Sequence, residues 1–135
     1  MRIVRIALAQ VNTTVGDLEG NAALVLRGIA AAREAKADLV VFPELTLTGY
    51  PPEDLVLRRQ FIDDNLKVLK EVVRKITGVA AVLGFIDRGE GLYNAAALCM
   101  AAGSWLGIIK YSCPTTECST RTDILSLENT QIRSS

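Results

Sequence analysis

The stretch VVFPELTLTGYPPEDL, residues 40–55, contains the transition that decides the fold. An apolar run, Leu39–Phe42, is interrupted by Pro43, and a carboxylate, Glu44, follows at once. Short apolar runs bounded by turn residues are typical of strands buried in a parallel sheet. Proline lacks the N–H that a strand needs, and the double proline in TGYPPEDL predicts a loop. Glu44 therefore stands at the carboxyl end of a predicted strand.

The segments before this stretch predict one strand and one helix. Residues 2–11, RIVRIALAQV, are mostly apolar without a clean period, which predicts a strand buried on both faces. Residues 22–37 predict an alanine-rich helix, with Asp17 and Asn21 as candidate caps. Gly28 is a weak point in that helix, costing about 1 kcal/mol relative to alanine.

The segments after it predict a second helix and three strands. Residues 79–86 predict a third buried strand, and residues 92–101 and 104–110 predict a hairpin. The resulting order, β-α-β-α-β-β-β, is that of an α/β layered domain. The second helix has an apolar face that repeats with helical spacing, and it is expected to stop at Gly78. The residues of that face are Ile62, Leu66, Leu69, Val73 and Ile76.

Composition narrows the possible functions. The chain has 135 residues, which fits one domain, and its 15 basic residues balance 15 acidic ones. We therefore expect neither nucleic acid nor a membrane as a partner, and without a signal-peptide pattern we expect a cytoplasmic protein. The sequence contains no histidine. A Ser-His-Asp triad or a histidine-ligated metal site is thus excluded, and catalysis must use carboxylates, lysines, cysteines or hydroxyls.

Glu44 and Lys110 are the candidate catalytic residues, because each ends a predicted strand. Sites in open α/β sheets gather beyond the carboxyl ends of the strands, where we expect Glu44 to be partly buried and usable as a base. Alternatively, Glu44 is a loop carboxylate that faces water, and Lys110 a solvated strand-end lysine. Together they suggest a base and an oxyanion stabiliser of an amide-hydrolysing site. The missing part is a nucleophile, normally a thiol where no histidine is available.

Four segments in this order carry a resemblance to a known family. They are RIALAQVNTTVGDLEGN, FPELTLTGYPPEDL, YNAAAL and the strand that ends in Lys110, and they resemble the nitrilase (carbon–nitrogen hydrolase) superfamily. GYPPEDL after FPEL is most similar to the N-terminal glutamine-amidase domain of glutamine-dependent NAD synthetases. The resemblance covers residues 2–110 and implies a partial α-β-β-α sandwich, about the first half of that domain, over residues 1–110. Residues 111–135 are rich in Ser and Thr and predict a poorly ordered tail.

The resemblance also implies roles for individual residues. The superfamily uses a Glu-Lys-Cys triad, in which Glu44 takes the place of the general base and Lys110 that of the oxyanion stabiliser. Tyr50 matches the loop that lines the glutamine pocket, or else it packs on the neighbouring prolines. Asn94 is expected to be a structural hydrogen-bonder. The implied substrate is L-glutamine, the implied assembly a homo-oligomer. The amidase half needs no cofactor, whereas ATP and magnesium serve a synthetase domain that the resemblance does not reach.

None of the three cysteines is expected to be the nucleophile. Cys99 lies in an apolar strand and is interpreted as a small buried apolar residue. Cys113 is three residues beyond Lys110, an odd offset that puts it on the opposite face of a continued strand. Cys118 lies in a segment without strand pattern, whereas a reactive thiol needs a shaped, electropositive setting. We therefore expect this chain to be inactive on its own.

The tail suggests why the nucleophile is missing. Codons permitted for KYSCPTTECSTRTDILSLENT, read from the third base of the lysine codon, can encode VQLPNYGVFDENRYFKPGEY. Those letters are not residues of this chain, but they resemble what the family carries after its lysine. Our hypothesis is a change of reading frame at or just after Lys110, in the gene or its recorded sequence. Sequencing the coding DNA tests it, and a next frame without that string would refute it.

Two other interpretations remain open at this point. The chain could descend from another superfamily enzyme, such as an aliphatic amidase, a nitrilase or a carbamoyl hydrolase. It could instead be a non-catalytic interaction fragment that pairs with a full-length subunit through its exposed sheet edges. In either case, half of a sandwich is expected to leave apolar surface uncovered.

Overall fold

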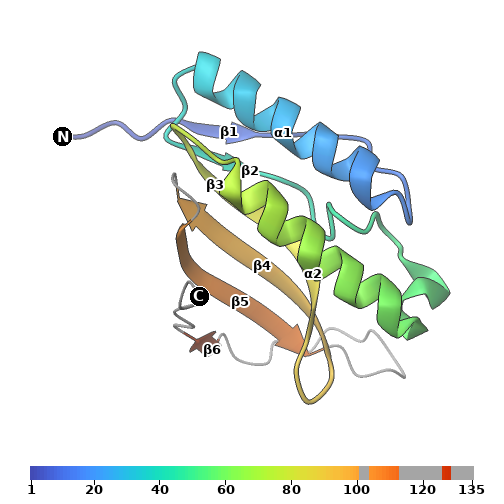
Figure 1. The fold of residues 1–135 in the computed structure, drawn as a ribbon. Coiled ribbons are helices and arrows are strands. Elements are labelled where there is room, and N and C mark those ends of the chain that lie inside the picture. The colour runs from blue at the N-terminus through green and yellow to red at the C-terminus, as the bar shows by residue number, and fades with distance from the viewer. Residues whose placement is uncertain (101–103, 113–125, 129–135) are drawn as a thin grey trace.

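The computed structural model describes residues 1–100 and the backbone of residues 104–112 and 126–128 (Figure 1). The predicted order β-α-β-α-β-β-β is confirmed, and the structure adds a short 3-10 helix in the predicted loop and a sixth strand, which makes this a mixed α/β fold. The strands are β1 (Ile6–Leu8), β2 (Leu39–Val41), β3 (Ala80–Arg88), β4 (Leu92–Met100), β5 (Ser104–Ser112) and β6 (Ser126–Glu128). The helices are α1 (Leu18–Glu34), the short 3-10 helix η1 (Glu53–Leu57) and α2 (Arg59–Arg74).

The strands form one sheet in their order along the chain, β1-β2-β3-β4-β5-β6. β1, β2 and β3 are parallel, whereas the later neighbours are antiparallel. The parallel strands are joined through α1 and α2, and both helices lie on the same side of the sheet (Figure 1). The carboxyl ends of the three parallel strands consequently meet at one edge, and Pro43 and Glu44 follow β2 there.

The main core lies between the two helices and the sheet. Gly28 of α1 has a packing role in it, because a Cβ added there would lie 2.8 Å from Cε1 of Phe42. The predicted weak point in the helix is therefore where the ring of Phe42 approaches α1. The largest core residues that are almost fully buried include Val25, Val40, Leu69, Val73, Leu83 and Phe85.

The expectation that residues 2–11 form a strand buried on both faces is wrong. β1 has only three residues, and the side chains of Ile6 and Leu8 are 58% and 73% exposed. Ala7, between them, packs against the core. The reason is that α1 and α2 cover one face of the sheet, and nothing among the described residues covers Ile6 and Leu8 on the other. The N-terminal edge of the sheet therefore presents apolar side chains to solvent.

One of the two candidate caps of α1 is confirmed. A carboxylate oxygen of Asp17 accepts a hydrogen bond from the amide N–H of Gly20 at 2.9 Å. Asn21 is instead a buried residue within α1, and its side-chain amide donates to the carbonyls of Thr14 and Leu47 at 2.8 and 3.0 Å. Its carbonyl oxygen accepts from the N–H of Thr14. Asn21 thus fixes two loops to the helix, including the loop that follows Glu44.

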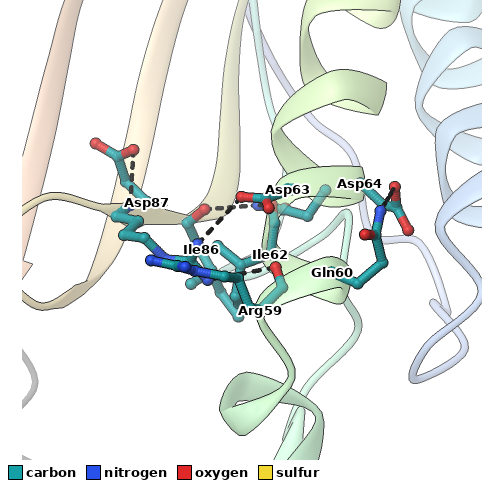
Figure 2. A network of polar contacts seen from close by, with 9 residues as sticks. Arg59, Gln60, Ile62, Asp63, Asp64, Ile86 and Asp87 are labelled. Atoms are coloured by element: carbon teal, nitrogen blue, oxygen red, sulfur yellow. Dashed lines mark hydrogen bonds and ion pairs between the residues drawn. The ribbon is translucent and has the colours of Figure 1, made fainter.

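Polar contacts fix α2 to the end of β3 (Figure 2). The side-chain amide of Asn65, which is fully buried, donates to the carbonyl oxygen of Ile86 at 2.6 Å. The guanidinium group of Arg88 lies 3.2 Å from a carboxylate oxygen of Asp63 and also donates to the carbonyl of Arg59. Such a solvent-exposed ion pair contributes at most about 1 kcal/mol, so the buried amide is the stronger constraint.

Part of the predicted tail has regular structure. β5 continues through Tyr111 and Ser112, and β6 pairs with it antiparallel. At these strands the structure differs from the expected irregular tail, whereas residues 113–125 and 129–135, with Cys113 and Cys118, lie outside the described residues. Within the described part of the chain, no helix is long and apolar enough to cross a membrane.

Candidate functional site

The loop that carries Glu44 is held by the core on both sides. Phe42 before it is buried, and so is the segment Leu45–Gly49 after it, where Leu47 has no exposed surface. The hydroxyl of Thr46 donates to the carbonyl of Pro43, which closes a tight turn around Glu44. A turn held between buried residues on both sides has few alternative conformations, so the position of the Glu44 backbone is well defined.

Gly84 of β3 allows this loop to lie directly on the sheet. A Cβ added at Gly84 would lie 2.5 Å from the backbone nitrogen of Leu45 and 2.9 Å from the carbonyl oxygen of Pro43. Real Cβ atoms do not approach backbone atoms so closely, and glycine within a strand often marks such an approach. Leu45 itself has a φ of 48°, in the left-handed region that residues with a Cβ rarely adopt. The turn that carries Glu44 therefore depends on the missing side chain at position 84.

Glu44 and Asn94 meet across a hollow at this edge of the sheet. The side-chain amide of Asn94, on β4, donates a hydrogen bond to Oε1 of Glu44. The hollow has a volume of about 430 Å³, within the range of roughly 300–1,000 Å³ that is usual for small-molecule sites. A carboxylate and an amide thus converge in a mainly apolar setting. The other lining residues are Phe42, Pro43, Val82, Gly84, Ala95 and Ala96.

The structure corrects one expectation about Glu44. The carboxylate was expected to be partly buried, but Glu44 belongs to the exposed residues. Asn94 and Gly84 belong to the sheet face opposite the core, the same face that leaves Ile6 and Leu8 uncovered. Burial of this site would require something to cover that face.

Lys110 and Tyr50 are the other two predicted site residues. In the strand register, Lys110 of β5 stands opposite Ala95, a residue of the main core, whereas Tyr111 stands opposite Asn94. The side chain of Lys110 lies outside the described residues. Tyr50 is 65% exposed and is not among the residues that line the hollow. The structure therefore brings Glu44 and Asn94 together, whereas in the register Lys110 pairs with the neighbour of Asn94 and not with Asn94 itself.

Cys99 is a buried, free cysteine, as expected. Burial raises the pKa of its thiol from 9.0 to about 12. The thiolate is the reactive form, so at pH 8 its population falls about a thousandfold relative to an ordinary cysteine. Cys99 therefore does not supply the nucleophile of an amidase site.

We expect the Cys99 thiol to react with a disulfide reagent such as dithionitrobenzoate about a thousandfold more slowly in the folded chain than in guanidinium chloride, at pH 8. The measurement uses a variant with Cys113→Ser and Cys118→Ser, so that one thiol remains.

The folded state keeps the thiol proton that the unfolded state loses above about pH 9. The free energy of unfolding should thus fall between pH 9 and 12 by about 1.4 kcal/mol per pH unit. Equal rates of thiol reaction in the folded and unfolded states, or an unfolding free energy that does not fall above pH 9, would contradict the burial of Cys99.

Sequence reasoning missed the roles of Gly84 and of the Glu44–Asn94 contact. A signal existed for the glycine, because Gly84 interrupts the apolar run VAAVLGFI, and a glycine inside a strand suggests a close backbone approach. Asn94 was expected to be a structural hydrogen-bonder and not a site residue, whereas it lines the hollow and its partner there is Glu44, 50 residues away in the sequence. Local patterns carry no information on such a distant partner.

Comparisons with known proteins identify the family of the chain. The model of the family described as carbon-nitrogen hydrolase matches residues 5–112. A glutamine-dependent NAD(+) synthetase of Thermotoga maritima is 44% identical over 112 residues, covering 82% of this chain and 19% of that protein. The crystal structure of such a synthetase from Cytophaga hutchinsonii matches with a TM-score of 0.76 and 30% identity, covering 84% of this chain and 20% of the other. An amidase from Nesterenkonia sp. matches with a TM-score of 0.67 and 27% identity, covering 79% of this chain and 42% of the other. The chain thus spans about a fifth of the length of the synthetases that it matches.

Proposed function

Since the chain belongs to the carbon–nitrogen hydrolase family, we propose that it forms the general-base half of a glutamine amidase site, of the kind that supplies ammonia for NAD synthesis. The observation that carries this proposal is the carboxylate of Glu44, presented in the hollow at the carboxyl end of β2 and bound by Asn94. Glutamine is favoured over other amides because the relative with 44% identity is a glutamine-dependent synthetase.

In the proposed reaction, Glu44 removes the proton of a cysteine thiol, and the thiolate attacks the carbonyl carbon of the glutamine side-chain amide. Lys110 stabilises the negative charge that develops on the carbonyl oxygen. Glu44 then returns the proton to the leaving nitrogen, which departs as ammonia and leaves a thioester. Water, activated by Glu44, hydrolyses the thioester to glutamate. Tyr50 is proposed to line the glutamine pocket when the site is complete.

The nucleophile of this reaction is proposed to come from outside residues 1–110. Cys99 is excluded by its burial. ATP and magnesium belong, in this proposal, to a synthetase domain beyond the matched residues, because the relatives are synthetases of which this chain covers about a fifth. On its own the chain should therefore hydrolyse no glutamine above background.

We also propose that residues 111–135 lie outside the hydrolase domain and arise from the changed reading frame. The family match ends at residue 112, two residues after Lys110. The coding DNA beyond the lysine codon is the test, as described above.

A chimera tests the proposed function. Residues 2–110 of this chain replace the matched segment of the Thermotoga maritima synthetase, and ammonia release from glutamine is measured. We expect glutaminase activity from the chimera and none from the 135-residue chain. A chimera that folds, as judged by circular dichroism, but hydrolyses no glutamine would contradict the proposal. The intact Thermotoga synthetase is the positive control.

A further inference from the structure

The contact between Asn94 and Glu44 has a consequence for how the carboxylate works. Given the proposed function, we infer that Asn94 is the positioning residue of Glu44: its amide binds Oε1 and leaves Oε2 as the oxygen that exchanges the proton with the thiol. The inference deepens the proposed function, because it assigns different roles to the two oxygens of the general base.

The first argument is the asymmetry of the two oxygens. Oε1 accepts a hydrogen bond from Asn94. Oε2 has no hydrogen-bond partner among the side chains and backbone groups that the structure describes. A carboxylate oxygen that already accepts an amide N–H is less basic than its free partner, since the bond stabilises its charge. The proton is therefore exchanged at Oε2.

The second argument is that donor and acceptor are both fixed independently of their contact. Glu44 lies on the turn that packs against Gly84. Asn94 stands opposite Ile86 in the β3–β4 register, and the carbonyl of Ile86 is bound by the buried amide of Asn65. The amide of Asn94 thus meets the carboxylate from a rigid strand, as positioning in a catalytic site requires.

The third argument is that the sheet does not need this contact. β3 and β4 pair continuously from Ala81↔Cys99 to Arg88↔Leu92, so the ladder holds Asn94 in place without help from its side chain. A purely structural role would moreover be better served by a buried partner, whereas Glu44 is exposed. The contact is therefore better explained by the orientation of the carboxylate than by the stability of the sheet.

The test is nuclear magnetic resonance of the full 135-residue chain, labelled with ¹⁵N and ¹³C. The side-chain amide signals of Asn94 should shift in the Glu44→Ala variant, because their acceptor is removed. The side-chain amide of Asn65, which binds a backbone carbonyl, is the internal control and should stay unchanged. Three-bond scalar couplings should report one dominant side-chain rotamer of Glu44. In the Asn94→Ala variant, the same couplings should take the averaged values of several rotamers.

Asn94→Asp serves as the shape-matched variant, because it keeps the size of the side chain and replaces the donor with a second carboxylate. It should also release Glu44 from its single rotamer at neutral pH. Asn94 signals that do not change in the Glu44→Ala variant, or Glu44 couplings that stay unchanged in both Asn94 variants, would overturn the inference. These readouts need no turnover, so an inactive chimera would refute the proposed function and leave this result unaffected.

Discussion

Replacing Glu44 with glutamine is expected to lower the kcat of the chimera for glutamine hydrolysis by about 10²–10⁴-fold. Glutamine has the shape of glutamate, so the loop over Gly84 and the contact with Asn94 can persist. It cannot accept the thiol proton, and it cannot return one to ammonia. Both steps of the proposed reaction therefore lose their acid–base group, while the volume of the hollow stays the same.

The measurement is steady-state release of ammonia at saturating and limiting glutamine. The KM for glutamine should change little, because the substitution removes an interaction needed in the transition state and not ground-state binding. Glu53→Gln is the matched control, because Glu53 is an exposed carboxylate nearby in the chain that does not line the hollow. A Glu44→Gln chimera that retains the kcat of its parent would exclude Glu44 as the general base.

Replacing Gly84 with alanine is expected to have the second large effect, because it acts on the turn that carries Glu44. The added methyl group would lie 2.5 Å from the nitrogen of Leu45. The turn must then move away from β3, together with the buried segment Leu45–Gly49 that follows it. Overpacking of this kind costs about 1–3 kcal/mol of unfolding free energy. A displacement of about 1 Å at a catalytic group can cost about 10²-fold in rate, so the kcat of the chimera should fall accordingly.

Two measurements check this prediction. Denaturant unfolding of the full chain gives the loss of stability, and ammonia release by the chimera gives the loss of kcat. Gly91→Ala is the control, because a Cβ at Gly91 would meet nothing within 4 Å. If Gly84→Ala matches Gly91→Ala in both stability and kcat, then the close approach of the turn to β3 does not position Glu44.

The features that were predicted correctly share a local origin. The apolar spacing of α2, the cap at Asp17 and the apolar runs of β3 and β4 each report on residues a few positions apart. The same is true of the Pro43–Glu44 step, which marks the end of β2. Hydrophobic period and turn chemistry are properties of short segments, so the sequence alone was sufficient for them.

The features that were missed depend on contacts between distant segments. β1 was expected to be buried, yet whether Ile6 and Leu8 are covered depends on what packs on the far face of the sheet. Asn21 was interpreted as a cap because asparagine favours helix starts, whereas its buried amide joins α1 to the loop at Leu47. The partner of Asn94 and the constraint at Gly84 likewise require the three-dimensional register of β3 and β4.

The packing of α1 against Phe42 limits the ways in which this chain can be stabilised. Engineers commonly replace helical glycines with alanine to raise the melting temperature. At Gly28 that exchange would press a methyl group to within 2.8 Å of the ring of Phe42, two residues before Glu44. The ring of Phe42, which is buried, or the helix itself would have to shift to make room. The exchange that usually raises the melting temperature is therefore expected to lower it at this position.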